Sequence, residues 1–308
     1  MVTTNSHQPC YPSIFKFITS HPTPTPTPTP TLPIISSSNF LINSPNFFLS
    51  NTMARKFGIF LTIFCILLTS CHADWNILNE QRTSSGLKIS LKNFCESWRM
   101  NVELHNIRNY QAVPQECIAY IGKYMTSTQY QVDSERTISE CILHLTTNCI
   151  LEKDGKDSWI FDIDDTLLSS VPYYKKNGFG GNKPNETALE DWMSQGKGTA
   201  LKHSLKLFNH LKELGVQIFL VSSRKEHLRS ATVDNLVHVG FYGWKELILR
   251  SQEDECKNVQ KFKAEARNKI ISKGYRIVGI IGDQWSSIVG LPSAKRSFKL
   301  PNPMYYIA

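Results

Sequence analysis

The feature that most constrains the fold of this chain is an alternation of short apolar runs with amphipathic segments after residue 157. Four clear runs and a candidate fifth have the length and composition of buried strands: 158–161, 216–221, 246–250, 276–281 and 297–300. Apolar residues at helical spacing fill several of the intervals, and these segments end at Gly215, Gly240 and Gly274. This alternation predicts a doubly wound α/β fold, in which a parallel sheet has helices on both faces.

A helical segment precedes this α/β core. Between residues 86 and 150, apolar side chains recur at helical spacing, as at Ile118, Ile121 and Met125, and no run has the pattern of a strand. Pro114 divides the segment, so we expect two to four helices. The mature chain is therefore predicted to consist of a helical segment at 74–150 and an α/β core at 151–308.

The first 73 residues differ in composition from the rest. Residues 1–52 contain a Pro–Thr repeat, which cannot bury a core, so we interpret them as a disordered or spurious N-terminal extension. Residues 53–73 have the order of a secretory signal peptide: a basic start, an apolar run and small residues before a cleavage site after Ala73. The alternative is a membrane anchor, although the apolar run is shorter than the roughly 20 residues that span a bilayer.

Export by this route would make the protein secreted or vacuolar, with no membrane attachment after cleavage. Disulfides are stable there, and the sequon at Asn185 could be glycosylated. Five cysteines would remain, an odd number that leaves at least one thiol free or joined to another chain: Cys95, Cys117, Cys141, Cys149 and Cys256. The net charge of +8 comes without basic runs interleaved with aromatic residues, so a nucleic-acid partner is not indicated.

Polar side chains occur where the predicted strands end. Doubly wound folds bind ligands outside the carboxyl ends of their strands, and the polar residues there are Asp162, Asp164, Ser222, Ser223 and Asp283. Asp162 and Asp164 are two residues apart, so both can project into one mouth, where a cation such as Mg²⁺ would relieve their repulsion. Such a pair can hold a metal, attack phosphorus and transfer a proton.

Residues 161–168 resemble the DxDxT signature of haloacid-dehalogenase-type phosphatases, with Asp162, Asp164 and Thr166 at its fixed positions. The longer stretch 159–174 resembles the plant acid phosphatases and vegetative storage proteins. Further likeness lies at 95–99, 282–285 and 299–303, so the resemblance extends from about residue 87 to the end. It implies a haloacid-dehalogenase-like fold and an acid phosphatase that hydrolyses small phosphate esters through an aspartyl-phosphate, with Mg²⁺.

The resemblance implies the catalytic and metal-binding roles of the acids. Asp162 would be the nucleophile. Asp164 would be the general acid that protonates the leaving oxygen, and then the base that activates water. Asp162, the main-chain carbonyl of Asp164, and Asp283 would hold Mg²⁺.

Other residues would bind the phosphoryl group. By resemblance, Ser222 would bond its oxygens and Lys263 would neutralise its charge, although Ser222 could instead cap a helix and Lys261 could replace Lys263. We place Ser223 and Arg224 with the substrate contacts. For Arg224 the alternative is a structural ion pair with one of two nearby acids, Glu226 or Asp234.

One position departs from the family pattern. Members often carry a second acid four residues after the metal-binding Asp283, where this chain has Ser287. Loss of that carboxylate is expected to weaken metal binding. The alternative function is therefore a vegetative storage protein with weak or vestigial phosphatase activity. The resemblance also implies a disulfide between Cys95 and Cys117, and it is compatible with a homodimer.

Overall fold

The structure is a computed structural model that describes residues 81–82, 88–183 and 185–308. Residues 77–308 form one compact unit. The predicted extension at 1–52 and the predicted signal peptide at 53–73 lie outside the described residues. Within the described part of the chain, no helix is both long and apolar enough to cross a membrane.

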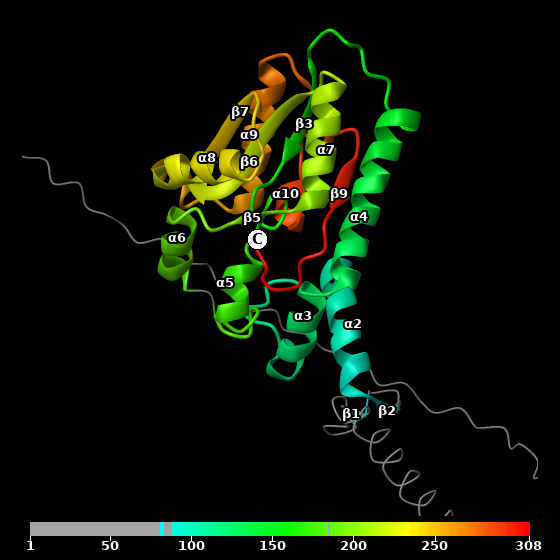
Figure 1. The fold of residues 1–308 in the computed structure, drawn as a ribbon, viewed down its shortest axis with the longest axis vertical. Coiled ribbons are helices and arrows are strands. Elements are labelled where there is room, and N and C mark those ends of the chain that lie inside the picture. Colours follow the sequence, from blue (N-terminus) through cyan, green and yellow to red (C-terminus); the bar gives the residue numbers. More distant parts are fainter. Residues whose placement is uncertain (1–80, 83–87, 184) are drawn as a thin grey trace, which may run out of the picture. The chain divides into compact units, whose positions relative to one another are not determined.

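A five-stranded parallel sheet forms the centre of the α/β core (Figure 1). Its order is β7-β6-β3-β8-β9, so the chain winds outward from β3 in both directions. The strands are β3 (Asp157–Phe161), β6 (Gln217–Lys225), β7 (Glu246–Arg250), β8 (Arg276–Gly282) and β9 (Ser297–Lys299). The predicted doubly wound α/β fold and all five predicted strands are confirmed.

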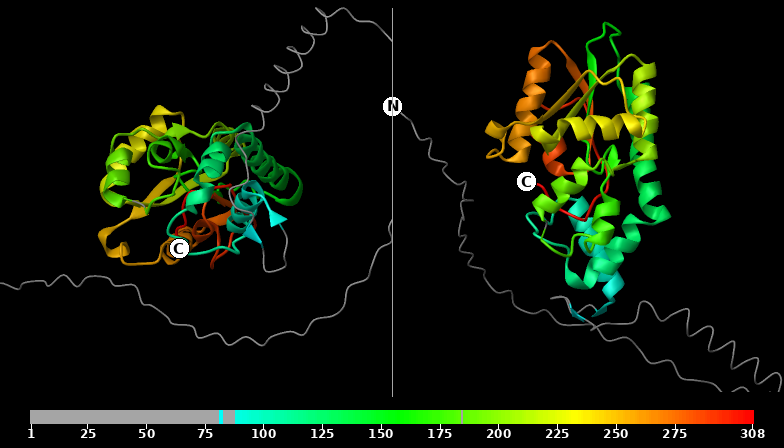
Figure 2. Two further views of the ribbon diagram at one scale, coloured as in Figure 1. Left: turned by 90° about the horizontal axis from the view of Figure 1, so that it is seen from below. Right: turned by 60° about the vertical axis from the view of Figure 1, so that its left-hand side comes forward.

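Helices cover both faces of the sheet (Figure 2). Three pack on one face and two on the other: α4 (Thr128–Leu143), α7 (Lys202–Glu213) and α8 (Arg229–His238), against α9 (Val259–Ser272) and α10 (Trp285–Ile288). Successive side chains of a strand point to opposite faces, so Trp159 and Phe161 of β3 join the first core and Ile160 joins the second. Because both faces are buried, the last three residues of β3, Trp159 to Phe161, are apolar in succession.

Gly279 allows β8 to lie close against β3. A Cβ atom at this position would lie 2.1 Å from Cζ3 of Trp159. The Trp159 side chain is fully buried and cannot move aside. A larger residue at 279 would therefore disturb the central pair of strands.

The helical segment consists of α2 (Leu91–Glu103), α3 (Ile118–Met125) and α4, with the short turns η2 (Gln115–Cys117) and η3 (His144–Asn148). Serines begin two of these helices: Ser90 accepts a hydrogen bond from the Asn93 amide, and Ser127 accepts one from the Tyr130 amide. The prediction of no strand is wrong, because β2 (Lys88–Ile89) pairs with β1 (Gln81–Arg82). Two residues are too few to show an alternating pattern in a sequence.

The segment between β3 and α7 contains short elements that hydrophobic spacing did not predict. They are β4 (Leu168–Ser169), α5 (Val171–Lys176), α6 (Glu186–Ser194) and β5 (Thr199–Ala200). Figure 1 shows α5 and α6 beyond the carboxyl end of the sheet. β6 also continues past its predicted end at Val221, because it pairs again with β7 at Lys225 after an irregularity. These elements supply walls of the site described below.

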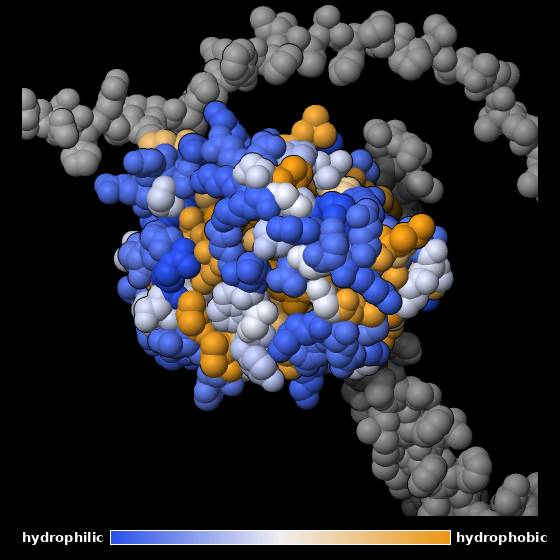
Figure 3. Space-filling view, turned by 90° about the horizontal axis from the view of Figure 1, so that it is seen from above, coloured by the Kyte–Doolittle hydropathy of each residue, from blue (hydrophilic) through white to orange (hydrophobic). Residues whose placement is uncertain are grey.

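The opposite end of the sheet faces solvent. Figure 3 views the molecule from that end and shows mostly hydrophilic side chains, with apolar ones scattered among them in small groups. Polar groups at an exposed end are ordinary for a globular protein.

A disulfide joins Cys95 of α2 to Cys117 of η2, 22 residues apart, as the resemblance implied. Cys141 and Cys149 are free thiols, the first buried and the second half-buried. The disulfide therefore closes a loop within the helical segment and leaves the α/β core unconstrained by this crosslink.

The double variant Cys95→Ala/Cys117→Ala is expected to lose about 3 kcal/mol of unfolding free energy, because the disulfide restricts the unfolded chain over a loop of this length. Urea denaturation would measure the loss. Cys149→Ala, which removes a free thiol, is the control and should change the midpoint little. An unchanged midpoint in the double variant would contradict a stabilising role for this disulfide.

Candidate active site

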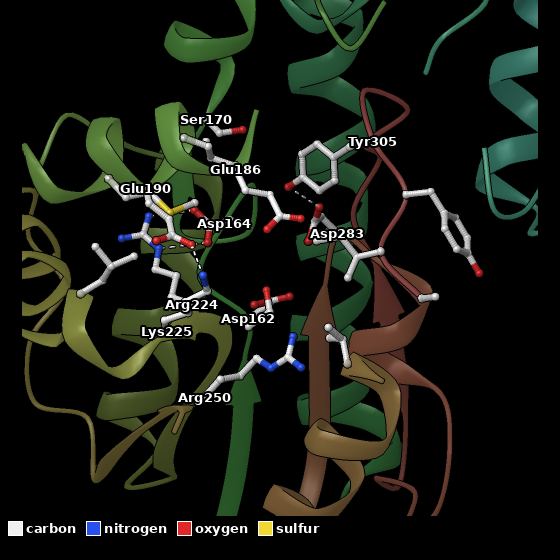
Figure 4. Close-up of a pocket in the computed structure, with 18 of the residues that line it drawn as sticks. Asp162, Asp164, Ser170, Glu186, Glu190, Arg224, Lys225, Arg250, Asp283 and Tyr305 are labelled. Atoms are coloured by element: carbon white, nitrogen blue, oxygen red, sulfur yellow. Dashed lines mark hydrogen bonds and ion pairs between the residues drawn. The ribbon is translucent and has the colours of Figure 1, made fainter. Parts of the chain in front are cut away.

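A pocket of about 530 Å³ lies at the carboxyl ends of the strands (Figure 4). Its walls come from the ends of β3, β6, β7 and β8, from α5 and α6, and from the last four residues. Five of the seven predicted site residues line it: Asp162, Asp164, Ser223, Arg224 and Asp283. The other two, Ser222 and Lys263, are buried and are not among its lining residues.

Asp162 lies directly after β3, and its carboxylate is bonded through both oxygens. Oδ1 accepts a hydrogen bond from the Ile163 amide at 2.8 Å. Oδ2 accepts one from Nζ of Lys263 at 2.5 Å and one from Oγ of Ser287 at 2.6 Å. Because only 8% of the side chain is exposed, these donors replace water in stabilising its negative charge.

Lys263 reaches Asp162 from the second turn of α9. Its side chain is 3% exposed, and its Nζ also lies 2.9 Å from Oγ of Ser287. Lys261, the alternative cation, is exposed. The structure thus brings Lys263, and not Lys261, to the predicted nucleophile.

Asp164 and Arg224 form an ion pair through two hydrogen bonds. Nε and Nη2 of Arg224 donate to the two carboxylate oxygens at 3.0 Å and 2.8 Å. Nη1 donates to Oγ1 of Thr232 in α8 at 3.0 Å, so the guanidinium is fixed at both ends. Burial opposes its charge, but attraction to Asp164 outweighs burial and raises the pKa of Arg224 above its ordinary value.

Arg224 does not pair with Glu226 or Asp234, the two alternative partners suggested by the sequence. Glu226 pairs instead with Arg229, and Asp234 lies 3.5 Å from the hydroxyl of Ser230. Strand β6 continues to Lys225, so Arg224 points into the pocket beside Asp164. Proximity in the sequence therefore suggested the wrong carboxylates as partners of Arg224.

Asp165 and Asp283 are buried next to each other under the tail that follows β9. The hydroxyl of Tyr305 lies 2.8 Å from Oδ2 of Asp165 and 2.9 Å from Oδ2 of Asp283. Nδ2 of Asn302 donates to Asp283 at 2.7 Å. Burial and the charge of Asp283 raise the pKa of Asp165 to about 7. Burial and the charge of Asp162 raise the pKa of Asp283 to about 6.

These acids fit a divalent cation. Oxygen atoms are the ligands that Mg²⁺ prefers, and the repulsion between Asp162 and Asp283 is what such a cation would remove. Among the described residues, no three His, Cys, Asp or Glu side chains form a complete metal cage. The predicted set of two carboxylates and the Asp164 carbonyl stays a prediction, and such a set would leave several positions of Mg²⁺ to water.

Residues 79–308 match the family model described as HAD superfamily, subfamily IIIB (acid phosphatase). The chain belongs to this acid phosphatase family. Two plant relatives are about two-fifths identical to it over the aligned residues. Acid phosphatase 1 of Solanum lycopersicum is 41% identical over 69% of this chain and 83% of its own length. Vegetative storage protein 1 of Arabidopsis thaliana is 42% identical over 74% of this chain and 84% of its own length.

A solved structure supports the same fold. The class C acid phosphatase from Bacillus anthracis, with tungstate bound, aligns with a TM-score of 0.53 over 62% of this chain and 86% of its own. Its sequence identity is 20%, so this likeness concerns the fold alone. The predicted haloacid-dehalogenase-like architecture is confirmed for this acid phosphatase family member.

Sequence reasoning assigned no role to several side chains of this site, among them Asp165, Arg250, Asn302 and Tyr305. Tyr305 belongs to the tail after β9 and reaches Asp283 across the fold, so no local pattern could reveal it. Asn302 lies in the family-like stretch 299–303, but nothing in that stretch indicated its contact with Asp283. Arg250 ends β7 and lines the pocket. The rule that polar residues matter at strand ends would have found Arg250 if it had been applied to that strand.

Ser287 takes part in the site, although it lacks the carboxylate that family members often have there. It is 3% exposed, and its hydroxyl contacts both Lys263 and Asp162. The hydroxyl therefore helps to fix the Asp162 carboxylate without adding negative charge.

Ser287→Asp is expected to lower the Mg²⁺ concentration for half-maximal activity about tenfold, because it adds a carboxylate beside Asp162. In chelator, the same variant should melt below the parent, since the added charge then has only Lys263 as a partner. Titration of activity and melting temperature with Mg²⁺ would measure both. Ser287→Ala, which adds no charge, is the control; an equal Mg²⁺ requirement in the Asp variant and the parent would contradict the expectation.

Proposed function

We propose that the protein hydrolyses small phosphate monoesters through an aspartyl-phosphate on Asp162, with Mg²⁺ bound by Asp162, Asp283 and the main-chain carbonyl of Asp164. The observation that carries the proposal is the placement of Asp162. It lines a pocket with Asp164 and Arg224, and a buried lysine is bonded to its carboxylate. Phosphoryl transfer depends mainly on positioning and charge stabilisation, and this arrangement supplies both.

In the proposed mechanism, Asp162 is the nucleophile and Asp164 transfers the protons. A carboxylate oxygen of Asp162 forms a bond to phosphorus while the ester P–O bond breaks, and Asp164 gives its proton to the leaving oxygen. Asp164 then takes a proton from water, whose oxygen attacks phosphorus and releases inorganic phosphate and the Asp162 carboxylate. Mg²⁺, when bound, would offset the charge of the carboxylates and the phosphoryl oxygens.

The pairing of Asp164 with Arg224 bears on the first step. A bidentate ion pair favours the ionised carboxylate, whereas a general acid must carry a proton. Phosphoryl oxygens would give Arg224 a competing partner in the same pocket. Substrate binding would thus release Asp164 from the ion pair and let it hold the proton that the leaving group needs.

The serines after the apolar part of β6 take different positions. Ser222 is fully buried, and its hydroxyl accepts a hydrogen bond from the Arg224 amide at 3.2 Å. Ser223 lines the pocket. In the proposed site Ser222 fixes the backbone of Arg224 and reaches a phosphoryl oxygen only by turning, and Ser223 contacts substrate directly.

A second candidate is a storage protein with weak phosphatase activity. It is favoured by Ser287, which removes an acid from the site, and by relatives named vegetative storage protein 1 of Arabidopsis thaliana and stem 28 kDa glycoprotein of Glycine max. The same relatives support a secretory or vacuolar route. Three further predictions stay proposals: a signal peptide at 53–73, glycosylation of Asn185 and a homodimer. The division of the mature chain into a helical segment at 74–150 and an α/β core at 151–308 is also a proposal.

Hydrolysis of an aryl phosphate tests the proposal, with the metal as the variable. Chelator should abolish turnover, and added Mg²⁺ should restore it, because Asp162 and Asp283 repel each other when no cation lies between them. Ca²⁺, a larger divalent ion with longer ligand distances, serves as the control and should restore much less. Full turnover in chelator would rule out a metal-dependent mechanism, and slow turnover in Mg²⁺ would favour the storage candidate.

A further inference from the structure

We propose that Arg250 binds an anionic group on the leaving-group side of the substrate, so that the site prefers phosphate monoesters with a second negative charge, such as a carboxylate or another phosphate. The inference rests on the proposed function and adds a substrate class to it. It concerns a residue outside the nucleophile, the acid–base pair and the metal ligands.

Arg250 differs from the other lining cations in its charge balance. Each of the others is paired with a carboxylate: Arg224 with Asp164, Lys225 with Glu190, and Lys257 with Asp254 and Glu265. Among the described residues, no carboxylate forms an ion pair with Arg250. The carboxylates of Asp254, Glu255 and Glu186 attract it electrostatically without forming an ion pair with it. Within the described pocket, Arg250 is therefore the lining cation with which an anionic group of a ligand can still form an ion pair.

The hydrogen bonds of Arg250 also leave donors unused. Nη2 donates to the carbonyls of Asp254, Glu255 and Lys257, which fixes the loop after β7. Nε is buried with no partner among the described residues. Burial lowers the pKa of Arg250, and attraction to Asp254, Glu255 and Glu186 does not fully compensate for it. A bound anion would supply that compensation.

The position of Arg250 suits the part of a substrate next to the phosphate. It is the last residue of β7 and pairs in register with Lys225 of β6, the strand that also provides Arg224. Figure 4 shows Arg250 and Asp162 bordering the same part of the pocket. The pocket volume of about 530 Å³ exceeds the space that a phosphoryl group needs, so a leaving group can lie beside Arg250.

The test compares two substrates that differ by one charge, phenyl phosphate and 4-carboxyphenyl phosphate. The parent protein should have the higher kcat/KM for the carboxylated ester. Arg250→Gln should reduce that preference about tenfold, mainly through KM, because a charge-assisted hydrogen bond is lost. Lys257→Gln is the matched control: it removes the same charge from the same pocket, but from a lysine already paired with two carboxylates, and should leave the preference within about twofold.

Arg250→Lys covers the case in which the Gln variant does not fold, since lysine can still bond the loop carbonyls. It should keep part of the preference, because it retains the charge and loses the second donor. An unchanged preference in either Arg250 variant, with both esters losing activity equally, would show that Arg250 only fixes the loop and would overturn the inference.

A failure of the proposed function can be told apart from a failure of this inference. If the parent protein turns over neither ester, the proposed function is wrong, and equilibrium binding of the two esters then tests Arg250. Tighter binding of the carboxylated ester that disappears in Arg250→Gln would support the inference, and equal binding of the two esters would overturn it.

Discussion

Asp162→Asn is expected to reduce the turnover of an aryl phosphate by at least about a thousandfold. The amide cannot form the aspartyl-phosphate, and it places an NH₂ group where a carboxylate oxygen now accepts bonds from Lys263 and Ser287. The folded structure should persist, because the substitution preserves volume and relieves the repulsion with Asp283, which offsets part of the lost ion pair with Lys263. Steady-state kinetics and circular dichroism would measure the two effects.

Asp234→Asn is the matched control for that variant. Asp234 is exposed on α8, so the same chemical change there should leave turnover within about twofold of the parent. Retention of activity in Asp162→Asn, at a level near that of the control, would remove Asp162 from the mechanism.

Arg224→Ala is expected to have the second-largest effect, with about a hundredfold loss of kcat/KM and about 3 kcal/mol of unfolding free energy. The loss of stability follows from burial. The Arg224 side chain is 1% exposed, and its removal leaves Asp164, 17% exposed, without its cation. The loss of activity follows because no other cation lies bonded to Asp164, on the described part of the chain, to receive the phosphoryl oxygens.

Two comparisons separate the causes of the Arg224 effect. Arg136→Ala removes an arginine from a surface pair with Glu140, in which the Arg136 side chain is 76% exposed, and should cost less than about 0.5 kcal/mol. Arg224→Lys keeps the positive charge but cannot form the two parallel hydrogen bonds of a guanidinium. It should recover part of the stability but little of the activity. Equal stability of Arg224→Ala and the parent would contradict the importance of the buried pair.

The fold was predictable because its signals are local. Each core strand is a short apolar run, and Trp159, Ile160 and Phe161 are buried in succession, as a strand covered on both faces requires. The acids of the site follow such a strand directly, so the same pattern that predicts β3 also places Asp162 and Asp164. Lys263 was predicted from the family resemblance, with Lys261 as the alternative.

The rest of the site depends on contacts between distant parts of the chain. Tyr305 contacts Asp165 across 140 residues, and Arg224 pairs with Asp164 across 60. Hydrophobic spacing within one element holds no information about such pairs. For Arg224, proximity in the sequence suggested Glu226 and Asp234 as alternative partners, whereas the structure pairs it with Asp164. The short elements α5 and α6 were missed for a related reason, since six and nine residues give a weak helical pattern.

The most direct test of the aspartyl-phosphate account is to trap the intermediate. The protein would be mixed with an aryl phosphate and Mg²⁺, quenched in acid and treated with borohydride, which reduces an aspartyl-phosphate to homoserine. Mass spectrometry of the peptide that contains residues 158–168 should then show homoserine at position 162 in the parent and none in Asp162→Asn. Turnover with no change at position 162, or with phosphate on another residue, would contradict the mechanism.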